Sequence, residues 1–551
     1  MQPKRRANST AAVAPPPHLT SNLALLALTI LLYTASFYSG SSLAPFAAFF
    51  ALVPAMAAAE GLGPLRSAIA GALSGAVALS IPCSWLASYH PVAITLVAFV
   101  GAWSFSAAFA AVSAILRTGH PAAPLAVALV WASADIARSV GFLAFPYGSL
   151  PYALAGNRVA LGLASIGGAP LVALAIAGAN ASCYAAARAI AHHGPGGRLR
   201  AALAALPAAA IVGAAVFGAA PPFFSRPDDS LVVASPNPAG EPVAGSFRVA
   251  LVQPCVYEQR SAPAYAAAFR KLAALSVEAA ERGADLVAWH ETAVVPPIAW
   301  HLKQRPDRLT YEFVSDVDRF LSAYPVPLLV GNGYADPDDR ARRVEHNSAL
   351  LFVSGAAIAR YDKAKLVPFS EYMPAWFGRA LPSLDRRVIA TFGPYWTPGS
   401  EAGLIELGDA RFAAPICFED SFARYFASFE EPDFFIVLTK DSWASSASMQ
   451  AQHLAMSRYR AAETGSIVLR VADTGSTAAI APDGAVVGEL APFEPGVLYA
   501  DVTLAAGTRT AYEAGGMYFD LAIPLLAALL STLCARRRPR EGLRIDKKRS
   551  V

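Results

Sequence analysis

Two hydrophobic patterns divide the chain. Residues 20–220 consist of long apolar stretches with few charges, and a further apolar stretch lies near the C-terminus. A membrane-spanning helix needs ~20 predominantly apolar residues. Stretches that approach this length predict eight spans, at 22–39, 43–60, 67–88, 92–116, 122–140, 160–189, 200–219 and 517–535. The pattern therefore predicts a polytopic α-helical membrane domain that encloses a polar insertion.

The insertion has the alternating pattern of a globular α/β domain. Short β-type runs such as 247–253 and 411–416 alternate with helical patterns such as 308–323 and 448–463. Strands that alternate with helices, together with hairpins, predict a layered sandwich. Because the preceding stretch is rich in Pro, Ser and Gly, we expect a linker there. The expected order is a membrane domain at 1–219, a linker at 220–246, the globular domain at 247–505, and a last span with a basic tail at 506–551.

Composition supports a membrane protein. Charged residues make up 15% of the 551 residues and hydrophobic residues 55%, with a mean hydropathy of +0.41. Soluble domains carry about 25% charged residues. The net charge of +4 is small and its excess lies at the termini, so nothing indicates nucleic-acid binding.

The cysteines and histidines do not follow a metal-binding pattern. No CxxC pair and no HExxH motif occurs, so we expect no metal site. A disulfide scaffold is not expected either, although Cys255 and Cys417 could pair in an oxidising compartment. The five cysteines are Cys83, Cys183, Cys255, Cys417 and Cys534.

The basic residues of the short loops predict an orientation. Lys and Arg are enriched in cytoplasmic loops. With eight spans, most basic loop residues fall on one side, and only the loop at 138–158 departs from the rule. We therefore expect both termini in the cytoplasm and the globular domain outside. The residues on the cytoplasmic side are Lys4, Arg5, Arg6, Arg66, Arg117, Arg188, Arg198, Arg200, Arg536, Arg537, Arg538, Lys547, Lys548 and Arg549.

Three polar residues each end a strand-like segment of the globular domain: Glu291, Lys363 and Cys417. A thiol, a carboxylate base and a fixed cation are the groups that acyl transfer through a thioester requires. The turn after Cys417 supplies backbone N–H groups that favour a thiolate. Each residue alone has an ordinary interpretation: a buried small side chain for the cysteine, and solvent-facing strand ends for the other two. Lys365 is expected on the same face as Lys363.

Longer strings resemble one branch of the nitrilase superfamily, the apolipoprotein N-acyltransferases. Residues 361–374 are similar to their YxKxxLVPFGEYVP segment, and 289–293 to their WPETA. The family's YNSA, QHLxMAR and GFPWG strings resemble 346–349, 452–458 and 141–148, respectively. These five strings occur in the family's order over nearly the whole chain.

The resemblance implies a nitrilase-like αββα sandwich and a reaction in two steps. Cys417 would attack the sn-1 ester of a membrane phospholipid, and the resulting thioester would acylate the N-terminal amine of a diacylglyceryl-cysteine lipoprotein. Glu291 would be the base and Lys363 the oxyanion cation, with Glu371 and Glu419 in support. No cofactor is implied. The implied location is a bacterial cytoplasmic (inner) membrane with the catalytic domain in the periplasm.

The chain departs from the family pattern around the site. Phe418 follows the nucleophile where the family has Tyr, and the segments 254–257 and 440–443 differ from the family's strings. These altered loops leave two alternatives open: a membrane-tethered amidase or nitrilase-type hydrolase, and a non-enzymatic lipoprotein-binding descendant. The aromatic-rich segment 372–396 is expected either as a membrane-facing arm or as ordinary core.

Overall fold

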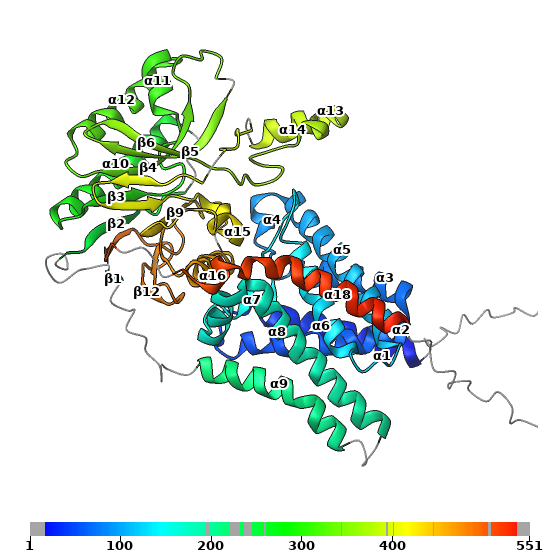
Figure 1. Ribbon diagram of the computed structural model, residues 1–551. Helices are drawn as coiled ribbons and strands as arrows, with labels where there is room; N and C mark the ends of the chain where they lie inside the picture. The colour runs from blue at the N-terminus through cyan, green and yellow to red at the C-terminus, as the bar shows by residue number, and fades with distance from the viewer. Residues whose placement is uncertain are drawn as a thin grey trace, which may run out of the picture.

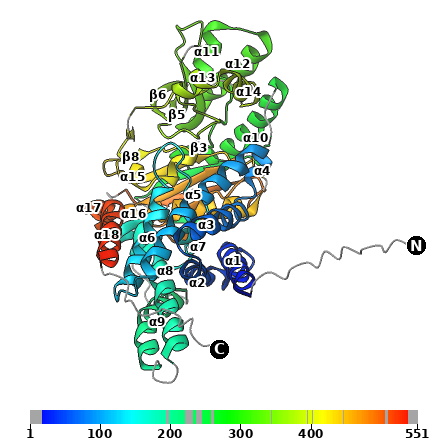
Figure 2. The same ribbon diagram turned by 90° about the vertical axis from the view of Figure 1, so that its right-hand side faces the viewer.

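The protein has a helical part and an α/β part packed side by side (Figures 1 and 2). The structure is a computed structural model that describes residues 17–193, 198–219, 232–235, 245–257, 261–342, 344–392, 395–400, 402–444, 446–504 and 509–536. The last helix, α18, returns from the α/β part and runs along the helical part (Figure 1). The α/β part is therefore inserted between two segments of one helical domain.

The helical domain contains helices long and apolar enough to cross a membrane. Among the described residues five reach that length, at Ala44–Leu62, Pro91–Leu116, Arg158–Ala191, Arg198–Val216 and Gly516–Arg536. The chain is thus a membrane protein, while the count of eight spans remains a prediction. The principal helices are α1 (Pro17–Ala35), α2 (Val53–Leu62), α3 (Pro64–Ser80), α5 (Pro91–Leu116), α6 (Ala123–Ala137), α8 (Arg158–His193), α9 (Arg198–Ala219) and α18 (Phe519–Arg536). Short helices connect them: η1 (Ala44–Phe49), α4 (Leu86–Tyr89), α7 (Leu150–Ala153), α17 (Ala511–Ala514) and η5 (Gly516–Tyr518).

Helix α8 is broken inside the region predicted as one span. Gly167 has φ −139° and Gly168 has φ +68°, so neither is helical, and Pro170 follows. The left-handed φ of Gly168 is accessible to glycine without steric cost. The break lies against the α/β domain, because Ala169 N donates to Glu463 Oε1 at 3.0 Å.

Helices α3 and α5 pack with their backbones in contact. A Cβ on Gly75 would lie 2.3 Å from Gly101 O, and a Cβ on Gly101 would lie 2.2 Å from Gly75 O. Small residues allow such close approach in membranes, where association depends on van der Waals packing. The glycines therefore set the distance between these two helices.

We expect Gly75→Val to separate α3 from α5 and destabilise the membrane domain by about 1–3 kcal/mol or more, because the contact is backbone and cannot yield. Thermal unfolding of the detergent-purified protein measures the effect. The matched control is Gly213→Val in α9, where a Cβ meets nothing within 4 Å. Equal melting temperatures for the two variants would contradict the assigned role of Gly75.

The α/β domain is a four-layered αββα sandwich. One mixed sheet has the order β1 (Val232–Ser235), β13 (Gly496–Val502), β2 (Phe247–Gln253), β3 (Leu286–Trp289), β4 (Leu328–Ala335), β5 (Glu345–Val353) and β6 (Ala356–Asp362). The other has the order β12 (Val486–Glu489), β11 (Ala478–Ile480), β10 (Ile467–Ala472), β9 (Phe434–Thr439), β8 (Ala410–Ala413) and β7 (Ile405–Leu407). The helices of this domain are α10 (Ala262–Glu281), α11 (Ile298–Gln304), α12 (Arg308–Ala323), α13 (Ala375–Ala380), α14 (Pro382–Phe392), η4 (Cys417–Ser421), α15 (Ala423–Phe426) and α16 (Ala447–Thr464).

The spacing of apolar residues along the helices and strands explains the layers of the sandwich. In α12 the buried residues Phe313, Val314, Val317 and Leu321 form one stripe, and they pack with α10 on the outer face of the first sheet. The side chain of Asp307 caps this helix by accepting from Thr310 N at 2.8 Å. Strands β3, β9 and β10 are buried throughout and β2 is buried after its first residue, and side chains from these strands fill the space between the sheets. The predicted sandwich is confirmed.

Helix α16 joins the two domains. Met449, Met456 and Tyr459 belong to the same hydrophobic core as the membrane helices, whereas Ala461 faces the core between the sheets. Polar contacts reinforce this docking: Tyr459 Oη donates to Pro151 O at 2.6 Å, and Gln452 Nε2 donates to Pro82 O at 2.8 Å. The junction is consequently a packed interface between the domains.

Most elements lie where the sequence predicts them, including 247–253 and 308–323. Strand β1 lies inside the range 220–246 that was expected to be a linker, and it pairs with β13 at the sheet edge. Residues 220–231 and 236–244 lie outside the described part of the chain.

Candidate active site at the junction of the two domains

The nucleophile candidate lies in a tight turn after the second sheet. Cys417 begins the 3-10 helix η4, and Ile416 before it bridges to Leu438 of β9. Cys417 has φ +51°, in the left-handed region that costs a non-glycine residue about 1–3 kcal/mol. Surrounding contacts must hold this conformation, which places the thiol at the end of the sheet.

Glu291 and Lys363 meet at the ends of β3 and β6. Lys363 Nζ lies 2.9 Å from Glu291 Oε1 and 2.9 Å from Glu371 Oε1. Asn347 Nδ2 donates to Glu291 Oε1 at 2.8 Å. Gly331 of β4 makes room for the Glu291 loop, because a Cβ there would lie 2.2 Å from His290 O. Glu291 and Lys363, which are far apart in sequence, thus form a buried ion pair that Glu371 shares.

Glu419 fixes the lysine segment to the cysteine turn. Its Oε1 accepts from Ala364 N at 2.7 Å and Lys365 N at 3.0 Å, and its Oε2 accepts from Ile416 N at 2.7 Å. Tyr361 Oη donates to the same carboxylate at 2.6 Å. A glutamate at the start of a helix is often exposed, where its charge is favourable to the helix dipole. The side chain is instead fully buried and connects the two loops.

The charges around Glu291 and Lys363 determine the protonation states of these two side chains. Burial disfavours charge on Glu291, but Lys363 and hydrogen bonds from Lys363, Asn347 and Cys417 outweigh it and lower the pKa of Glu291. Burial also opposes the charge of Lys363, yet Glu291 and Glu371 hold its pKa well above the ordinary value. An anionic base therefore faces a permanent cation.

The turn after Cys417 was expected to favour a thiolate, but the surroundings of the thiol have the opposite effect on its pKa. Burial and the negative charge of Glu291 raise the pKa of Cys417 well above its ordinary value, and Lys363 offsets this only in part. The backbone N–H groups of the turn do not outweigh these effects. The resting thiol is protonated, so it needs a base to become a nucleophile.

Sequence reasoning assigned no role to a buried charge network behind the cysteine turn. Arg470 pairs with Asp420 at 3.1 Å and with Asp441 at 2.8 Å, while His453 lies 3.1 Å from an oxygen of each carboxylate. Ser457 donates to Asp420 at 2.7 Å. All these side chains are buried, and Asp420 belongs to η4. The QHLxMAR-like string that contains His453 and Ser457 was the available signal.

The network carries a pH-dependent charge. Burial and Arg470 lower the pKa of His453, but Asp420 and Asp441 outweigh them and raise it to about 9. A group whose pKa is raised in the folded state stabilises the fold below its unfolded pKa of about 6.5 and loses this effect as the pH rises. The imidazolium therefore contributes stability that disappears between about pH 6.5 and the folded pKa.

We expect the melting temperature of the wild type to fall relative to His453→Gln as the pH is raised from 6.5 to 9, since only the wild type loses a proton from the network. Thermal unfolding in detergent across this range measures it, with His120→Gln as the matched control. If the melting temperatures of the wild type and His453→Gln change in parallel with pH, His453 does not carry the pH-dependent charge.

Aromatic side chains of the membrane domain surround the same site. Trp443, from the altered segment 440–443, packs on Trp85 with ring centroids 5.5 Å apart and on Tyr89 at 5.3 Å. Tyr147, from the 141–148 string, lies 6.1 Å from the His453 ring. The altered segment therefore contacts the membrane domain as well as the sheet.

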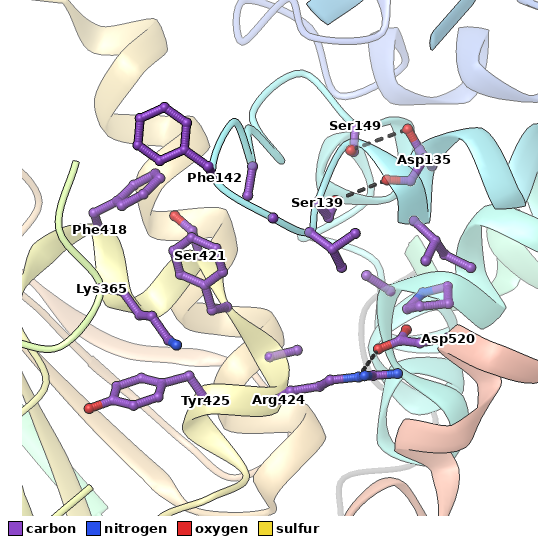
Figure 3. Close-up of a pocket in the computed structure, with 18 of the residues that line it drawn as sticks. Asp135, Ser139, Phe142, Ser149, Lys365, Phe418, Ser421, Arg424, Tyr425 and Asp520 are labelled. Atoms are coloured by element: carbon purple, nitrogen blue, oxygen red, sulfur yellow. Dashed lines mark hydrogen bonds and ion pairs between the residues drawn. The ribbon is translucent and has the colours of Figure 1, made fainter. Parts of the chain in front are cut away.

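A cavity of about 720 Å³ opens between the domains beside the nucleophile turn. Its lining joins Phe418 and Tyr425 of the α/β domain to Phe142 and Pro170 of the membrane domain. Figure 3 shows Phe418 and Phe142 together on one side, and Lys365, Tyr425 and Arg424 along another. The space is mainly apolar with a few charged groups, which is the usual lining of a small-molecule site.

The position of Lys365 and the pairing of the cysteines can also be compared with the sequence analysis. Lys365 does not share the surroundings of Lys363: Lys363 is buried in the ion-paired cluster, whereas Lys365 is exposed and lines the cavity. All five cysteines are free, so Cys255 and Cys417 are not paired. Within the described ranges no group of three or more His, Cys, Asp or Glu side chains is arranged to hold a metal ion.

The aromatic segment 372–396 forms helices α13 and α14, which project from the sandwich (Figure 1). Trp376 is 61% exposed, while Trp396 N donates to Glu371 O at 2.9 Å. The projecting part favours the membrane-facing arm, and the base of the segment supports the catalytic cluster.

Comparisons with known proteins match both halves of the chain. Residues 20–182 match the family model Apolipoprotein N-acyltransferase N-terminal domain, and residues 248–512 match Carbon-nitrogen hydrolase. Apolipoprotein N-acyltransferase 1 of Treponema pallidum is 32% identical over 497 residues, which cover 82% of this chain and 84% of that protein. Apolipoprotein N-acyltransferase 1 of Treponema denticola is 28% identical over 549 residues, with 94% and 96% covered.

Among solved structures, a mutant of the amidase from Nesterenkonia sp. AN1 aligns with 50% of this chain and 96% of its own. The identity is 17% and the TM-score 0.36. That structure carries the acetamide moiety of fluoroacetamide covalently added at its active-site cysteine.

Proposed function

The chain belongs to the apolipoprotein N-acyltransferase family, and we propose that it transfers a fatty acyl chain from a membrane phospholipid to the N-terminal amine of diacylglyceryl-cysteine lipoproteins. One observation carries the proposal: the Glu291–Lys363 pair and the thiol of Cys417 lie together where the α/β domain meets the membrane helices. An enzyme that uses lipid substrates needs its nucleophile at such a junction.

In the first half-reaction, Glu291 accepts the thiol proton of Cys417 as the sulfur attacks the ester carbonyl carbon of the phospholipid. A C–S bond forms, and Lys363 stabilises the oxyanion of the tetrahedral intermediate. The C–O bond of the ester then breaks, and Glu291 returns the proton to the departing alkoxide. The products are a thioester on Cys417 and a lysophospholipid.

In the second half-reaction, the α-amine of the lipoprotein cysteine attacks the thioester carbonyl. Glu291 accepts a proton from the amine, the C–N bond forms and the C–S bond breaks. Cys417 regains its proton from Glu291. The thioester preserves the reactivity of the acyl group, so the residues at hand suffice for both steps.

Supporting roles follow from the contacts. Glu371 shares the ammonium of Lys363 and accepts from Val367 N at 2.8 Å, so it orients the cation. Glu419 keeps the lysine and cysteine loops in register. Phe418 lines the cavity next to the nucleophile and offers an apolar wall to an acyl chain.

The basic residues of the short loops support an orientation with the catalytic domain in the periplasm and both termini in the cytoplasm. We propose residues 1–219 and 506–551 as the two membrane segments and residues 247–505 as the catalytic domain. Strand β1 is added to the catalytic sheet. The hydrolase and non-enzymatic alternatives are not favoured, because the relatives match both halves of the chain.

The test is incubation of the purified protein with phospholipid and a diacylglyceryl-cysteine peptide, followed by mass spectrometry of the peptide. We expect the mass of one fatty acyl group on its N-terminus and an equimolar lysophospholipid. Release of free fatty acid with an unmodified peptide would support the hydrolase instead.

A further inference from the structure

One side of the cavity between the domains carries charge that the catalytic steps do not use. Lys365, Arg424 and Asp520 line it together with Tyr425. Arg424 Nε lies 2.5 Å from Asp520 Oδ2, and Lys365 Nζ lies 5.2 Å from the centroid of the Tyr425 ring. Figure 3 shows these side chains along one edge of the space.

The charges at this cavity do not cancel. Asp520 is neutralised by Arg424, and Asp135 on the opposite wall is neutralised by Arg138 at 2.8 Å. Lys365 has no carboxylate partner within ion-pair distance among the residues that the structure describes. The cavity therefore presents an excess of one positive charge.

This excess distinguishes between the two lipids of the reaction. The acceptor brings a positive ammonium group, which a cation repels, whereas a glycerophospholipid brings a phosphodiester with one negative charge. The apolar remainder of the wall, such as Ile136, Ala169 and Ala173 of the membrane helices, suits an acyl chain of either lipid. The positive charge of the cavity therefore favours binding of the phospholipid donor over binding of the lipoprotein acceptor.

The cavity lies next to the catalytic cluster. Lys365 follows Lys363 by two residues, and Phe418, which follows Cys417, lines the same cavity. A donor whose ester carbonyl is at Lys363 and Cys417 can therefore extend its head group into the cavity toward Lys365.

We propose that Lys365 binds the phosphodiester of the acyl donor and makes this cavity the donor head-group site. This inference rests on the proposed function and specifies how that function selects its donor. Lys365 would act on donor binding, while Lys363 acts on the chemistry.

The experiment measures the rate of acyl-adduct formation on Cys417 by mass spectrometry. The donors are phosphatidylethanolamine, phosphatidylglycerol and a diacylglycerol with the same acyl chains but no phosphate. The variants are Lys365→Met, Lys365→Arg and, as a matched control, Lys303→Met, which removes an exposed lysine paired with Asp338 on another face. Glycerophosphoethanolamine, the head group without acyl chains, serves as a soluble competitor.

We expect Lys365→Met to lower kcat/KM for both phospholipids by about tenfold or more, the range of a hydrogen bond to a charged group. Reaction of the diacylglycerol and of Lys303→Met should be unchanged, and Lys365→Arg should retain most of the rate. Inhibition by glycerophosphoethanolamine should weaken by a similar factor in Lys365→Met.

Other outcomes overturn either this inference or the proposed function. An equal loss with all donors and unchanged competition would mean a structural role for Lys365, and an effect on phosphatidylethanolamine alone would mean that it contacts the head-group alcohol and not the phosphate. If the wild type forms no adduct with any donor, the proposed function itself fails. An adduct that forms normally but is not passed to the peptide would reject the acceptor and leave the head-group site intact.

Discussion

We expect Cys417→Ala to abolish adduct formation and transfer, with a loss of at least ~10³-fold, because no other described nucleophile shares the Glu291–Lys363 cluster and the thioester cannot form without sulfur. Mass spectrometry after incubation with phospholipid measures the first step, and addition of the diacylglyceryl-cysteine peptide measures the second. The wild type should gain one acyl group on Cys417 and lose it to the peptide.

The control for this result is Cys183→Ala, which removes another free cysteine, in the membrane helix α8. It should behave as the wild type. Transfer activity that survives in Cys417→Ala would reject the thioester mechanism and leave direct attack by the amine. Thermal unfolding of both variants distinguishes loss of chemistry from loss of fold.

Glu291→Gln should lower the rate of adduct formation by about 10²–10⁴-fold, the range that general-base catalysis contributes. The reason is the protonation state of the site: the thiol has a raised pKa and cannot ionise by itself, so its proton must go to a carboxylate. Glutamine occupies nearly the same volume but accepts no proton. Single-turnover adduct formation measures the step without interference from product release.

The pH dependence provides a second test of the same residue. The pKa of Glu291 is lowered, so the base remains ionised at and below neutral pH and becomes protonated only in acid. The pKa of Cys417 is raised, so the thiol remains protonated at neutral pH. We therefore expect a wild-type rate that is level through neutral pH and falls in acid, and a much lower rate for Glu291→Gln without this fall.

A matched control is Glu312→Gln, which removes an exposed carboxylate paired with Arg308 on α12. It should leave both rate and pH profile unchanged. If Glu291→Gln reacts at the wild-type rate, the base must be another group, and Glu371 is the nearest carboxylate on the same lysine.

The sequence alone determined the layers of this protein and the identity of its candidate residues. The stripe in α12 has the period of a half-buried helix, and the short, mainly apolar runs of β9 and β10, rich in β-branched and aromatic residues, are typical of buried strands. Glu291, Lys363 and Cys417 were found because each ends a strand-like segment and together they supply the groups that thioester chemistry requires, and the family strings selected Lys363 over Lys365.

Only the tertiary structure decided the environment of each group. The raised pKa of Cys417 depends on burial and on Glu291, which approaches it across the fold, and local sequence carries no record of either. The burial of Glu419 also depends on the assembled fold, because partners such as Ala364 N lie far away in the chain.

The same holds for the features that the sequence did not predict. The network of Asp420, Asp441, His453 and Arg470 combines four separate segments, so no short motif contains it. The separate environments of Lys363 and Lys365 arise because one faces the cluster and the other faces a cavity that exists only when the membrane helices pack against the sandwich. Sequence periodicity records which face of an element is buried, whereas the partner that buries it is fixed by the assembled fold.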